Sequence, residues 1–300
     1  MDMTQNKCCR HGASLRRRRR RRRKILRSII FSCSIIAVAV FVAVGSRMIT
    51  SGDGGTNRYD VEAGNNTYDN AVIENSKISG KNKIQNNQSM LDDIMNSTQY
   101  PKQLKDLALK NEEALEFVYD YPAEHVKEHT IDLTEEASMD SVPLFVQWDK
   151  RWGYEKYSGN FFAASGCGPT TLSMVVVYLT HNREASPIAV AKYSKEAGYS
   201  VDGSGSSWTL ISEGCMHYGV KAKAVALDES RMKAELDEGH PIVVNVGPGD
   251  FTDTGHFMVI TGYDDEGFSI NDPNSIEKSG KRWLFKNISS QIRAVWSMYV

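Results

Sequence analysis

The chain has 300 residues, of which 41% are hydrophobic and 24% are charged. This length suffices for one good-sized domain with attached segments, and the composition excludes a collagen, a disulfide-packed miniprotein and a fully disordered chain. The net charge of −1 averages two unlike parts. Residues 1–27 carry twelve basic residues and one acid, so the rest of the chain is acidic, and we expect no nucleic-acid partner.

An apolar segment directly follows this basic tail. The eight consecutive arginines at 16–23 could be an RNA-binding or nuclear-targeting patch, but residues 28–44 contain no charged side chain. A helix of this length nearly crosses the hydrocarbon core of a bilayer. Because cations accumulate on its N-terminal side, we predict a cytoplasmic tail over 1–27 and a single-pass transmembrane signal-anchor over 28–46, with everything C-terminal outside the cell membrane.

Cleavage of this segment is an alternative to anchoring. Ala43, Val44 and Gly45 form a small-residue pattern that a signal peptidase could cut, and cleavage after Gly45 would give a secreted protein. Both alternatives place the rest of the chain outside the cytoplasm.

Two segments precede the densest part of the sequence. Residues 47–99 are rich in Ser, Asn, Gly, Asp and Lys and show no sustained apolar period, which predicts a disordered stalk. Residues 100–140 begin with two short helical patterns, with Pro101 suited to the first turn of one and Asn111 suited to the cap of the other. This region is either a helical linker that packs on the following domain or a removable, inhibitory pro-segment.

Residues 141–300 have the apolar density of a folded domain. A helix is predicted after Pro169 and another from Ser207, and strand patterns follow at 221–227, 241–246, 256–263, 267–272 and 294–299. Helices followed by antiparallel strands predict an α+β fold. The Gly-Ser segment 201–208 either borders a cleft or only connects two helices.

Cys167 has the sequence context of a nucleophile. It lies in S-G-C-G-P-T-T-L, with a glycine on each side, just before the predicted helix. The N-terminus of a helix stabilises a thiolate, and its free N–H groups, including that of Cys167 itself, can hold an oxyanion. The other cysteine of this domain is Cys215, and a disulfide between the two is the alternative.

A thiolate nucleophile needs an imidazole as its base. Of the histidines outside the basic tail, His256 is the best candidate, because it opens the strand H-F-M-V-I-T-G-Y behind an unhindered Gly255. If the following hairpin turns at D-E-G, Asp264 pairs with Phe268, and Asp272 shares a face with His256. Ideal pairing leaves Asp272 four residues short of the histidine, so a bulge or a wider turn must close the gap.

The motifs S-G-C-G-P-T-T-L-S-M, G-H-F-M-V-I-T-G-Y-D and I-N-D-P, in this order, resemble the papain-like cysteine peptidases. They are most similar to the branch of the double-glycine leader peptidases of bacteriocin exporters, and V-P-L-F-V-Q-W-D-K-R-W resembles the entry segment of that branch. The resemblance implies a papain-like fold, with Cys167 as nucleophile, His256 as general base and Asp272 as the residue that orients the histidine. It also implies a glutamine that donates to the oxyanion, which we assign to Gln147, twenty residues upstream of the cysteine.

We therefore expect a membrane-anchored, monomeric cysteine peptidase that acts on peptides or proteins without a cofactor. Cell-wall peptide cross-links or amide bonds are an alternative substrate of the same triad, and a surface binding module without turnover is a second alternative. Asp250 and Asp253 could suggest a metal, but their segment lacks the ligand spacing of a calcium loop, and we expect no metal.

Overall fold

The computed structural model describes residues 83–300, which lie within one structural unit, Tyr68–Val300. The predicted tail, the predicted signal-anchor and most of the predicted stalk lie outside the described residues. Among residues 83–300, no helix is long and apolar enough to cross a membrane.

The helical layer is built around α8 (Cys167–Thr180), the helix predicted after Pro169. Every residue from Gly168 to Val177 is buried, because bulky apolar side chains occur on all of its faces. Helix α9 (Pro187–Glu196) packs against α8 and begins at Ser186, whose side chain accepts the N–H of Ala189. Shorter elements complete the layer: α6 (Thr134–Ser138), α7 (Phe162–Ser165), α10 (Thr209–Ser212), the 3₁₀ helix η2 (Gly214–Tyr218) and the ribbons β1 (Lys156–Tyr157) with β2 (Asn160–Phe161) and β3 (Ser200–Val201) with β4 (Gly205–Ser206).

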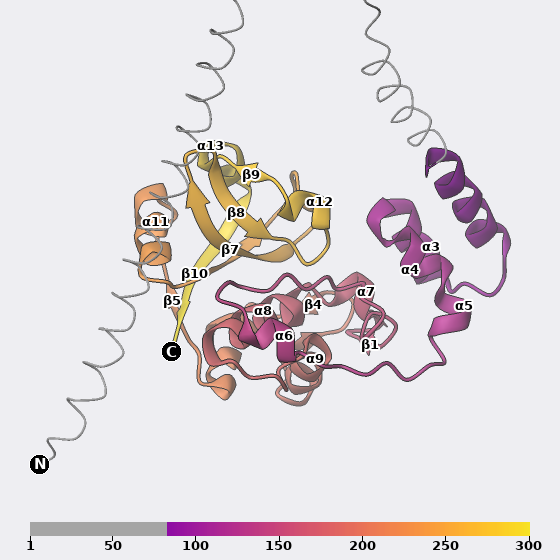
Figure 1. Cartoon of the computed structure of the whole chain (residues 1–300), viewed down its shortest axis with the longest axis horizontal. Helices are drawn as coiled ribbons and strands as arrows, with labels where there is room; N and C mark the ends of the chain where they lie inside the picture. The colour runs from indigo at the N-terminus through magenta and orange to yellow at the C-terminus, as the bar shows by residue number, and fades with distance from the viewer. Residues whose placement is uncertain (1–82) are drawn as a thin grey trace, which may run out of the picture. The chain divides into compact units, whose positions relative to one another are not determined.

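A six-stranded antiparallel sheet lies beside this helical layer (Figure 1). Its order is β5-β10-β6-β7-β8-β9. The strands are β5 (Lys221–Ala224), β6 (Ile242–Val246), β7 (His256–Asp264), β8 (Gly267–Asn271), β9 (Arg282–Trp283) and β10 (Ile292–Tyr299). Helices followed by an antiparallel sheet confirm the predicted α+β class.

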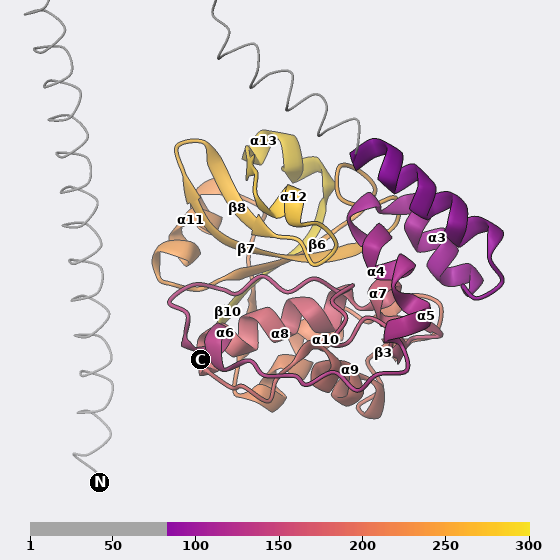
Figure 2. The same cartoon turned by 45° about the vertical axis from the view of Figure 1, so that its right-hand side comes forward.

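The two faces of the sheet belong to different cores. Phe257 and Val259 of β7 pack with the apolar side chains of α8, whereas Met258 and Ile260 pack with Met232 of α11 (Glu229–Asp237) on the other side. This alternation follows from the two-residue period of a strand. Figure 2 shows α8 on one side of the sheet and α11, α12 (Ile276–Ser279) and α13 (Phe285–Ile288) on the other. The 3₁₀ helix η3 (Ser289–Gln291) precedes β10 in the chain.

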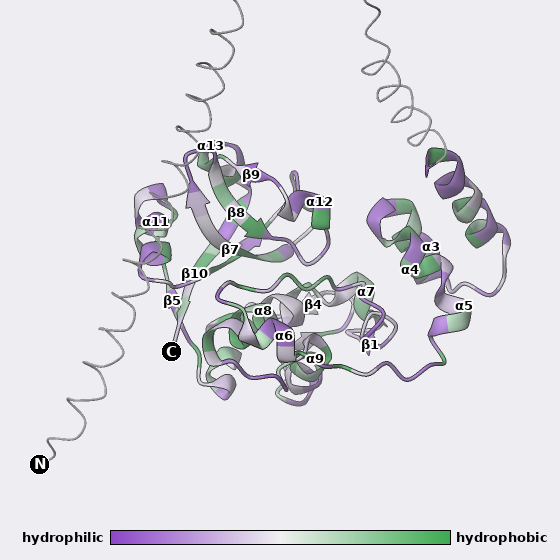
Figure 3. Cartoon of the chain, in the orientation of Figure 1, coloured by the Kyte–Doolittle hydropathy of each residue, from purple (hydrophilic) through white to green (hydrophobic). Residues whose placement is uncertain are grey.

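An N-terminal helical segment, residues 83–125, forms a third apolar cluster. It contains helix 83–96, α3 (Lys102–Lys110), the 3₁₀ helix η1 (Glu112–Ala114), α4 (Leu115–Tyr119) and α5 (Tyr121–Glu124). Its helices carry both polar and apolar residues (Figure 3). Their buried side chains pack with Phe161 and Ala163 of the domain. As predicted, Asn111 caps η1, its side chain accepting the N–H of Glu113. Pro101, predicted in the first turn of its helix, is instead the N-cap residue that precedes α3.

The predicted disordered stalk over 47–99 is wrong at its C-terminal end. Residues 83–96 are helical, and Met90, Leu91 and Ile94 contact the apolar cluster, with Ile94 fully buried. Three apolar residues at helical spacing suffice to dock this helix, although polar residues dominate its composition.

Two local predictions in the domain also need correction. The helix predicted from Ser207 is divided into α10 and η2, because the backbone leaves helical geometry at Glu213, just before Gly214. The hairpin pairs Asp264 with Gly267 rather than with Phe268, so its turn is one residue tighter than expected.

Candidate active site

Cys167 is the first residue of α8, as the sequence predicts. Its flanking glycines are required by close packing, since a Cβ on Gly166 would lie 2.6 Å from the ring of Phe162. A Cβ on Gly168 would lie 2.6 Å from Oγ of Ser206 in β4. The G-C-G pattern therefore lets two neighbouring segments close around the start of the helix, and the thiol is held at the open end of α8.

His256 and Asp272 lie in direct contact. His256 is the first residue of β7 and is 6% exposed, and its Nε2 donates to Oδ1 of the fully buried Asp272 at 2.7 Å. The Cys167 thiol lies beside the same imidazole, close enough for His256 to lower the pKa of the thiol. The structure thus brings together the three residues predicted as a triad, in the order Cys167, His256, Asp272.

Burial and the neighbouring groups have opposite effects on the pKa values of Cys167 and His256. Burial by itself would raise the pKa of the Cys167 thiol, but the hydrogen bond and charge of His256, with the N–H groups of Phe257 and Gly168, lower it overall. Burial by itself would lower the pKa of His256, but the charge and hydrogen bond of Asp272, together with Cys167, raise it to about 10. Both changes favour a thiolate beside an imidazolium ion.

A β-bulge brings Asp272 to the histidine. Next to the turn, β7 and β8 pair with Asp264 opposite Gly267. The register shifts between Ile260 and Gly262, so that further along the strands Asn271 lies opposite Val259. This shift moves the end of β8 towards the start of β7 and closes part of the predicted four-residue gap. Asn271 then donates to the carbonyl oxygens of the entry segment, whereas Asp272 accepts from His256.

The loop after β8 holds the Asp272 carboxylate. Oδ1 accepts the N–H of Asn274 at 2.8 Å as well as Nε2 of His256, and the Asp272 N–H donates to Oγ of Ser279 at 2.9 Å. Oδ2 is buried without a hydrogen-bond partner among the described residues. The side chain is therefore fixed through one oxygen.

Gln147 lies between the two halves of the site. It is 4% exposed, its N–H donates to the carbonyl of Pro273 at 2.7 Å, and its Nε2 donates to the carbonyl of Ala163 at 2.7 Å. It thus connects the residue after Asp272 with the short helix α7 that precedes Cys167. Its role as an oxyanion donor stays a prediction.

A cleft of about 730 Å³ opens beside Cys167. Small and polar residues line most of it, and they come from five segments: 158–160, 164–165, 203–206, 245–248 and 254–255. The Gly-Ser segment predicted either to border a cleft or to connect helices therefore borders it. Trp208 forms part of the wall, and Arg293 is the one charged side chain among the described residues that line the cleft.

Sequence reasoning missed Asn245 and Arg293. Asn245 is a polar residue inside the buried strand β6, lines the cleft and donates to the carbonyl of His256 at 3.3 Å. A lone asparagine in P-I-V-V-N-V was a usable signal, because buried polar groups require partners. Arg293 carries no such signal, since the strand pattern of β10 begins at residue 294.

The disulfide alternative is wrong, because Cys167 and Cys215 are both free. Cys215 is buried in η2, and its burial raises the pKa of its thiol to about 11. Two other histidines have structural contacts away from Cys167: His217 stacks on Tyr193, and His240 contacts Glu235.

Within residues 83–300, no group of three or more His, Cys, Asp or Glu side chains could hold a metal ion. Asp250 is engaged by Gln291, whose Nε2 donates to its carboxylate at 2.6 Å and whose Oε1 accepts its N–H at 2.7 Å.

Residues 139–300 match the model of the Peptidase C39-like family, so the chain belongs to this family of cysteine peptidases. Its structure is similar to the peptidase domain of Streptococcus ComA, described as a bifunctional ABC transporter of a quorum-sensing pathway, with 20% identity over 45% of this chain and 90% of that one and a TM-score of 0.36. It is also similar to a protein described as a C39-like peptidase from Bacillus anthracis, with 18% identity over 53% of this chain and 95% of that one and a TM-score of 0.33. No curated protein matches the chain.

Proposed function

We propose that this C39-like cysteine peptidase hydrolyses peptide bonds with Cys167 as nucleophile, His256 as general base and Asp272 as the residue that orients the histidine. The observation that carries the proposal is the hydrogen bond between His256 and the buried Asp272 carboxylate, with this imidazole beside the Cys167 thiol at the start of α8. A cysteine peptidase needs this arrangement to hold a reactive thiolate near neutral pH.

In the proposed reaction, each step is assigned to a residue. His256 takes the thiol proton, and the sulfur attacks the carbonyl carbon of the scissile bond. The tetrahedral oxyanion is stabilised by the Cys167 N–H at the start of α8 and by Nε2 of Gln147. The imidazolium then protonates the leaving amine, which leaves an acyl-enzyme. His256 next removes a proton from water, the hydroxide attacks the thioester, and the acid product departs as the thiol is restored.

Asp272 acts through the histidine. Because its Oδ1 accepts from Nε2, it leaves the other ring nitrogen for the thiol and fixes the ring orientation. Its charge also stabilises the imidazolium that forms when the thiolate is generated.

We further propose that residues 28–46 anchor the enzyme in the cell membrane and that the peptidase acts outside the cytoplasm. The support is the uncharged run at 28–44 behind a strongly basic tail. Protease protection of the full-length protein in sealed cells tests this topology, because an external domain is digested without permeabilisation and a cytoplasmic one is not.

Labelling of the full-length protein with iodoacetamide near pH 6, followed by mass mapping, tests the site. We expect Cys167 to react much faster than Cys215 and to lose this advantage in His256→Ala. Hydrolysis of a peptide library by wild type, and its loss in Cys167→Ala, completes the test. Including cross-linked cell-wall peptides separates the two proposed substrate classes. Equal reactivity of the two cysteines together with no cleavage of any peptide would refute the peptidase mechanism and leave the binding-module hypothesis.

A further inference from the structure

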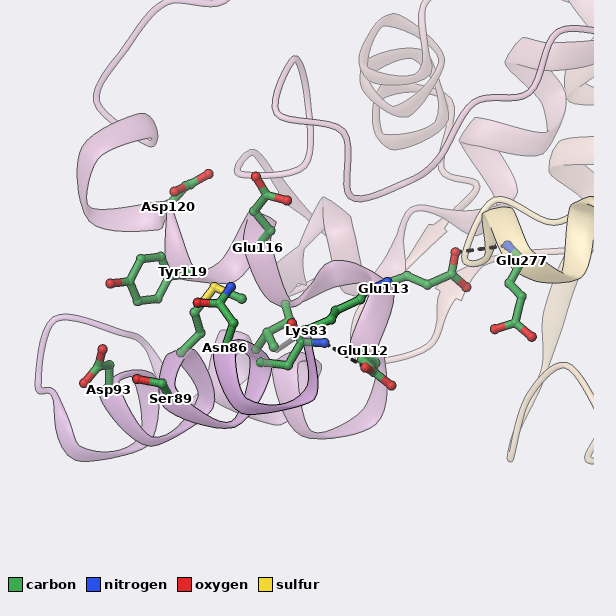
Figure 4. A pocket seen from close by; sticks show the side chains of 13 residues that line it. Lys83, Asn86, Ser89, Asp93, Glu112, Glu113, Glu116, Tyr119, Asp120 and Glu277 are labelled. Atoms are coloured by element: carbon green, nitrogen blue, oxygen red, sulfur yellow. Dashed lines mark hydrogen bonds between the residues drawn. The ribbon is translucent and has the colours of Figure 1, made fainter. Parts of the chain in front are cut away.

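The loop that carries Asp272 is held from outside the family domain. The family match covers residues 139–300, yet Glu113 of the N-terminal helical segment reaches the turn that follows Asp272. One Glu113 carboxylate accepts three donors there: the hydroxyl of Ser275, the N–H of Ile276 at 2.7 Å and the N–H of Glu277 at 3.1 Å. Figure 4 shows Glu113 extended towards the backbone nitrogen of Glu277.

These contacts stabilise the turn by giving its backbone N–H groups an acceptor. The N–H groups of Ile276 and Glu277 belong to the first turn of α12 and have no partner within that helix. A carboxylate is well suited to accept them, and hydrogen bonds to an ionised acceptor are stronger than neutral ones. Glu113 therefore fixes the start of α12, three to five residues after Asp272.

A second contact leads directly to the Asp272 carboxylate. Nδ2 of Asn111 donates to the carbonyl oxygen of Asn274 at 2.9 Å and to its Oδ1 at 3.1 Å. The N–H of Asn274 in turn donates to Oδ1 of Asp272, the same oxygen that accepts from His256. The N-terminal helical segment is thus connected to the proposed triad through a single residue.

The same segment also packs on the chain before Cys167. Its apolar cluster includes Phe161, the last residue of β2, and Ala163 of α7, the short helix that precedes α8. None of residues 83–157 lines the cleft beside Cys167. The segment therefore contacts both sides of the site without covering it, which is the arrangement of a support and not of a blocking pro-segment.

We propose that the N-terminal helical segment is an activating part of the enzyme, and that Glu113 is a positioning residue that holds the 272–277 turn so that Asp272 meets His256. This inference rests on the proposed function of the triad. Loss of the Glu113 contacts would release the turn and weaken the hydrogen bond between Asp272 and His256. The imidazolium would then be less favoured, and the thiolate of Cys167 with it.

The test compares two adjacent glutamates in the full-length protein. Glu113→Ala removes the contacts to the turn, whereas Glu112→Ala is a matched control, because Glu112 accepts from Asn87 at 2.8 Å within the N-terminal helical segment. We expect Glu113→Ala to lower kcat for a cleaved peptide by roughly tenfold to a hundredfold, as a misplaced catalytic group does, with little change in KM. Glu112→Ala should stay within about twofold of wild type, because it leaves the catalytic geometry unchanged.

The pH profile distinguishes positioning from a general loss of stability. A weaker contact between Asp272 and His256 should move the acid limit of activity in Glu113→Ala to higher pH and the alkaline limit to lower pH. Partial unfolding would not move these limits. Glu113→Gln keeps one oxygen acceptor and should recover part of the activity; it also serves as the test variant if Glu113→Ala does not fold. Circular dichroism and the absence of iodoacetamide labelling at the buried Cys215 show whether a variant is folded.

Two results would overturn the inference while the proposed function stands. One is a wild-type enzyme that cleaves peptides and a Glu113→Ala variant with the same kcat and pH profile as Glu112→Ala. The other is a Glu113→Ala variant that is more active than wild type, because the segment would then be inhibitory. If the wild-type protein cleaves no peptide and Cys167 is no more reactive than Cys215, the proposed function and this inference both fail.

Discussion

Replacing Asp272 with asparagine removes the carboxylate charge beside His256 while keeping a side chain of the same size. The amide oxygen can still accept from Nε2 of His256 and from the N–H of Asn274. The amide nitrogen takes the place of Oδ2, which is buried without a partner among the described residues. The substitution therefore isolates the contribution of the charge.

The magnitude follows from the pKa of His256. It stands at about 10, against an ordinary value of 6.5, and one pKa unit corresponds to about 1.4 kcal/mol. The buried site thus favours the imidazolium by about 5 kcal/mol in spite of the burial penalty. Asp272 is the largest favourable contributor, ahead of Cys167, so its neutralisation should lower the pKa of His256 by roughly one to three pH units, the usual effect of a neighbouring opposite charge.

The direction in which the pH profile changes follows from the protonation state of the active enzyme. A thiolate–imidazolium pair exists above the lowered pKa of Cys167 and below the raised pKa of His256. In Asp272→Asn the alkaline limb of kcat/KM should move to lower pH. The acid limb should move to higher pH, because a less stable imidazolium supports the thiolate less well.

Peptide hydrolysis measured between pH 4 and 11 provides the assay, with iodoacetamide labelling of Cys167 as an independent measure of the thiolate. Asp272→Ala, which also removes the hydrogen bond, should lose more kcat than Asp272→Asn. An alkaline limb that stays in place in Asp272→Asn would refute the electrostatic role of the carboxylate. Asp272 would then act only through orientation of the ring.

Three further predictions concern the surroundings of the pair. Gln147→Ala should lower kcat by about a hundredfold through loss of an oxyanion donor while labelling of Cys167 stays unchanged; an unaffected kcat would remove Gln147 from the mechanism. Gly168→Ala places a Cβ 2.6 Å from Oγ of Ser206 and should cost about 1–3 kcal/mol of stability, measured by chemical unfolding, because β4 must move; wild-type stability would show that β4 moves freely. Arg293→Ala should raise KM for peptides with a carboxylate near the scissile bond more than for their amide counterparts, since Arg293 is the one charged side chain among the described residues of the cleft wall, and an equal change for both would assign it no part in recognition.

Local chemistry pointed to the proposed nucleophile and the proposed base. Cys167 between two glycines at a helix start and His256 at the beginning of an apolar strand are patterns within a few neighbouring residues. Helix and strand periods are likewise local properties, so α8 and strands β5, β6, β7, β8 and β10 were predictable as elements. The family match over residues 139–300 agrees with the family that these motifs resemble.

The register between β7 and β8 was not predictable to the residue. The sequence indicated that a bulge or a wider turn was needed, but the tighter turn at Asp264 and the shift between Ile260 and Gly262 depend on how both faces of the sheet pack. Likewise, the polar composition of residues 83–96 concealed a helix that forms because Ile94 and its neighbours find an apolar partner surface.

By itself, the sequence determined which side chains carry the proposed chemistry and the class of fold that presents them. Only the tertiary structure decided how these side chains meet. Each of the decisive contacts joins residues that are apart in the chain. They are the hydrogen bond between His256 and Asp272, the hydrogen bonds of Glu113 to the following turn, and the placement of Arg293 in the cleft. Such contacts depend on the packing of whole elements against one another, and no local pattern of residue types records that packing.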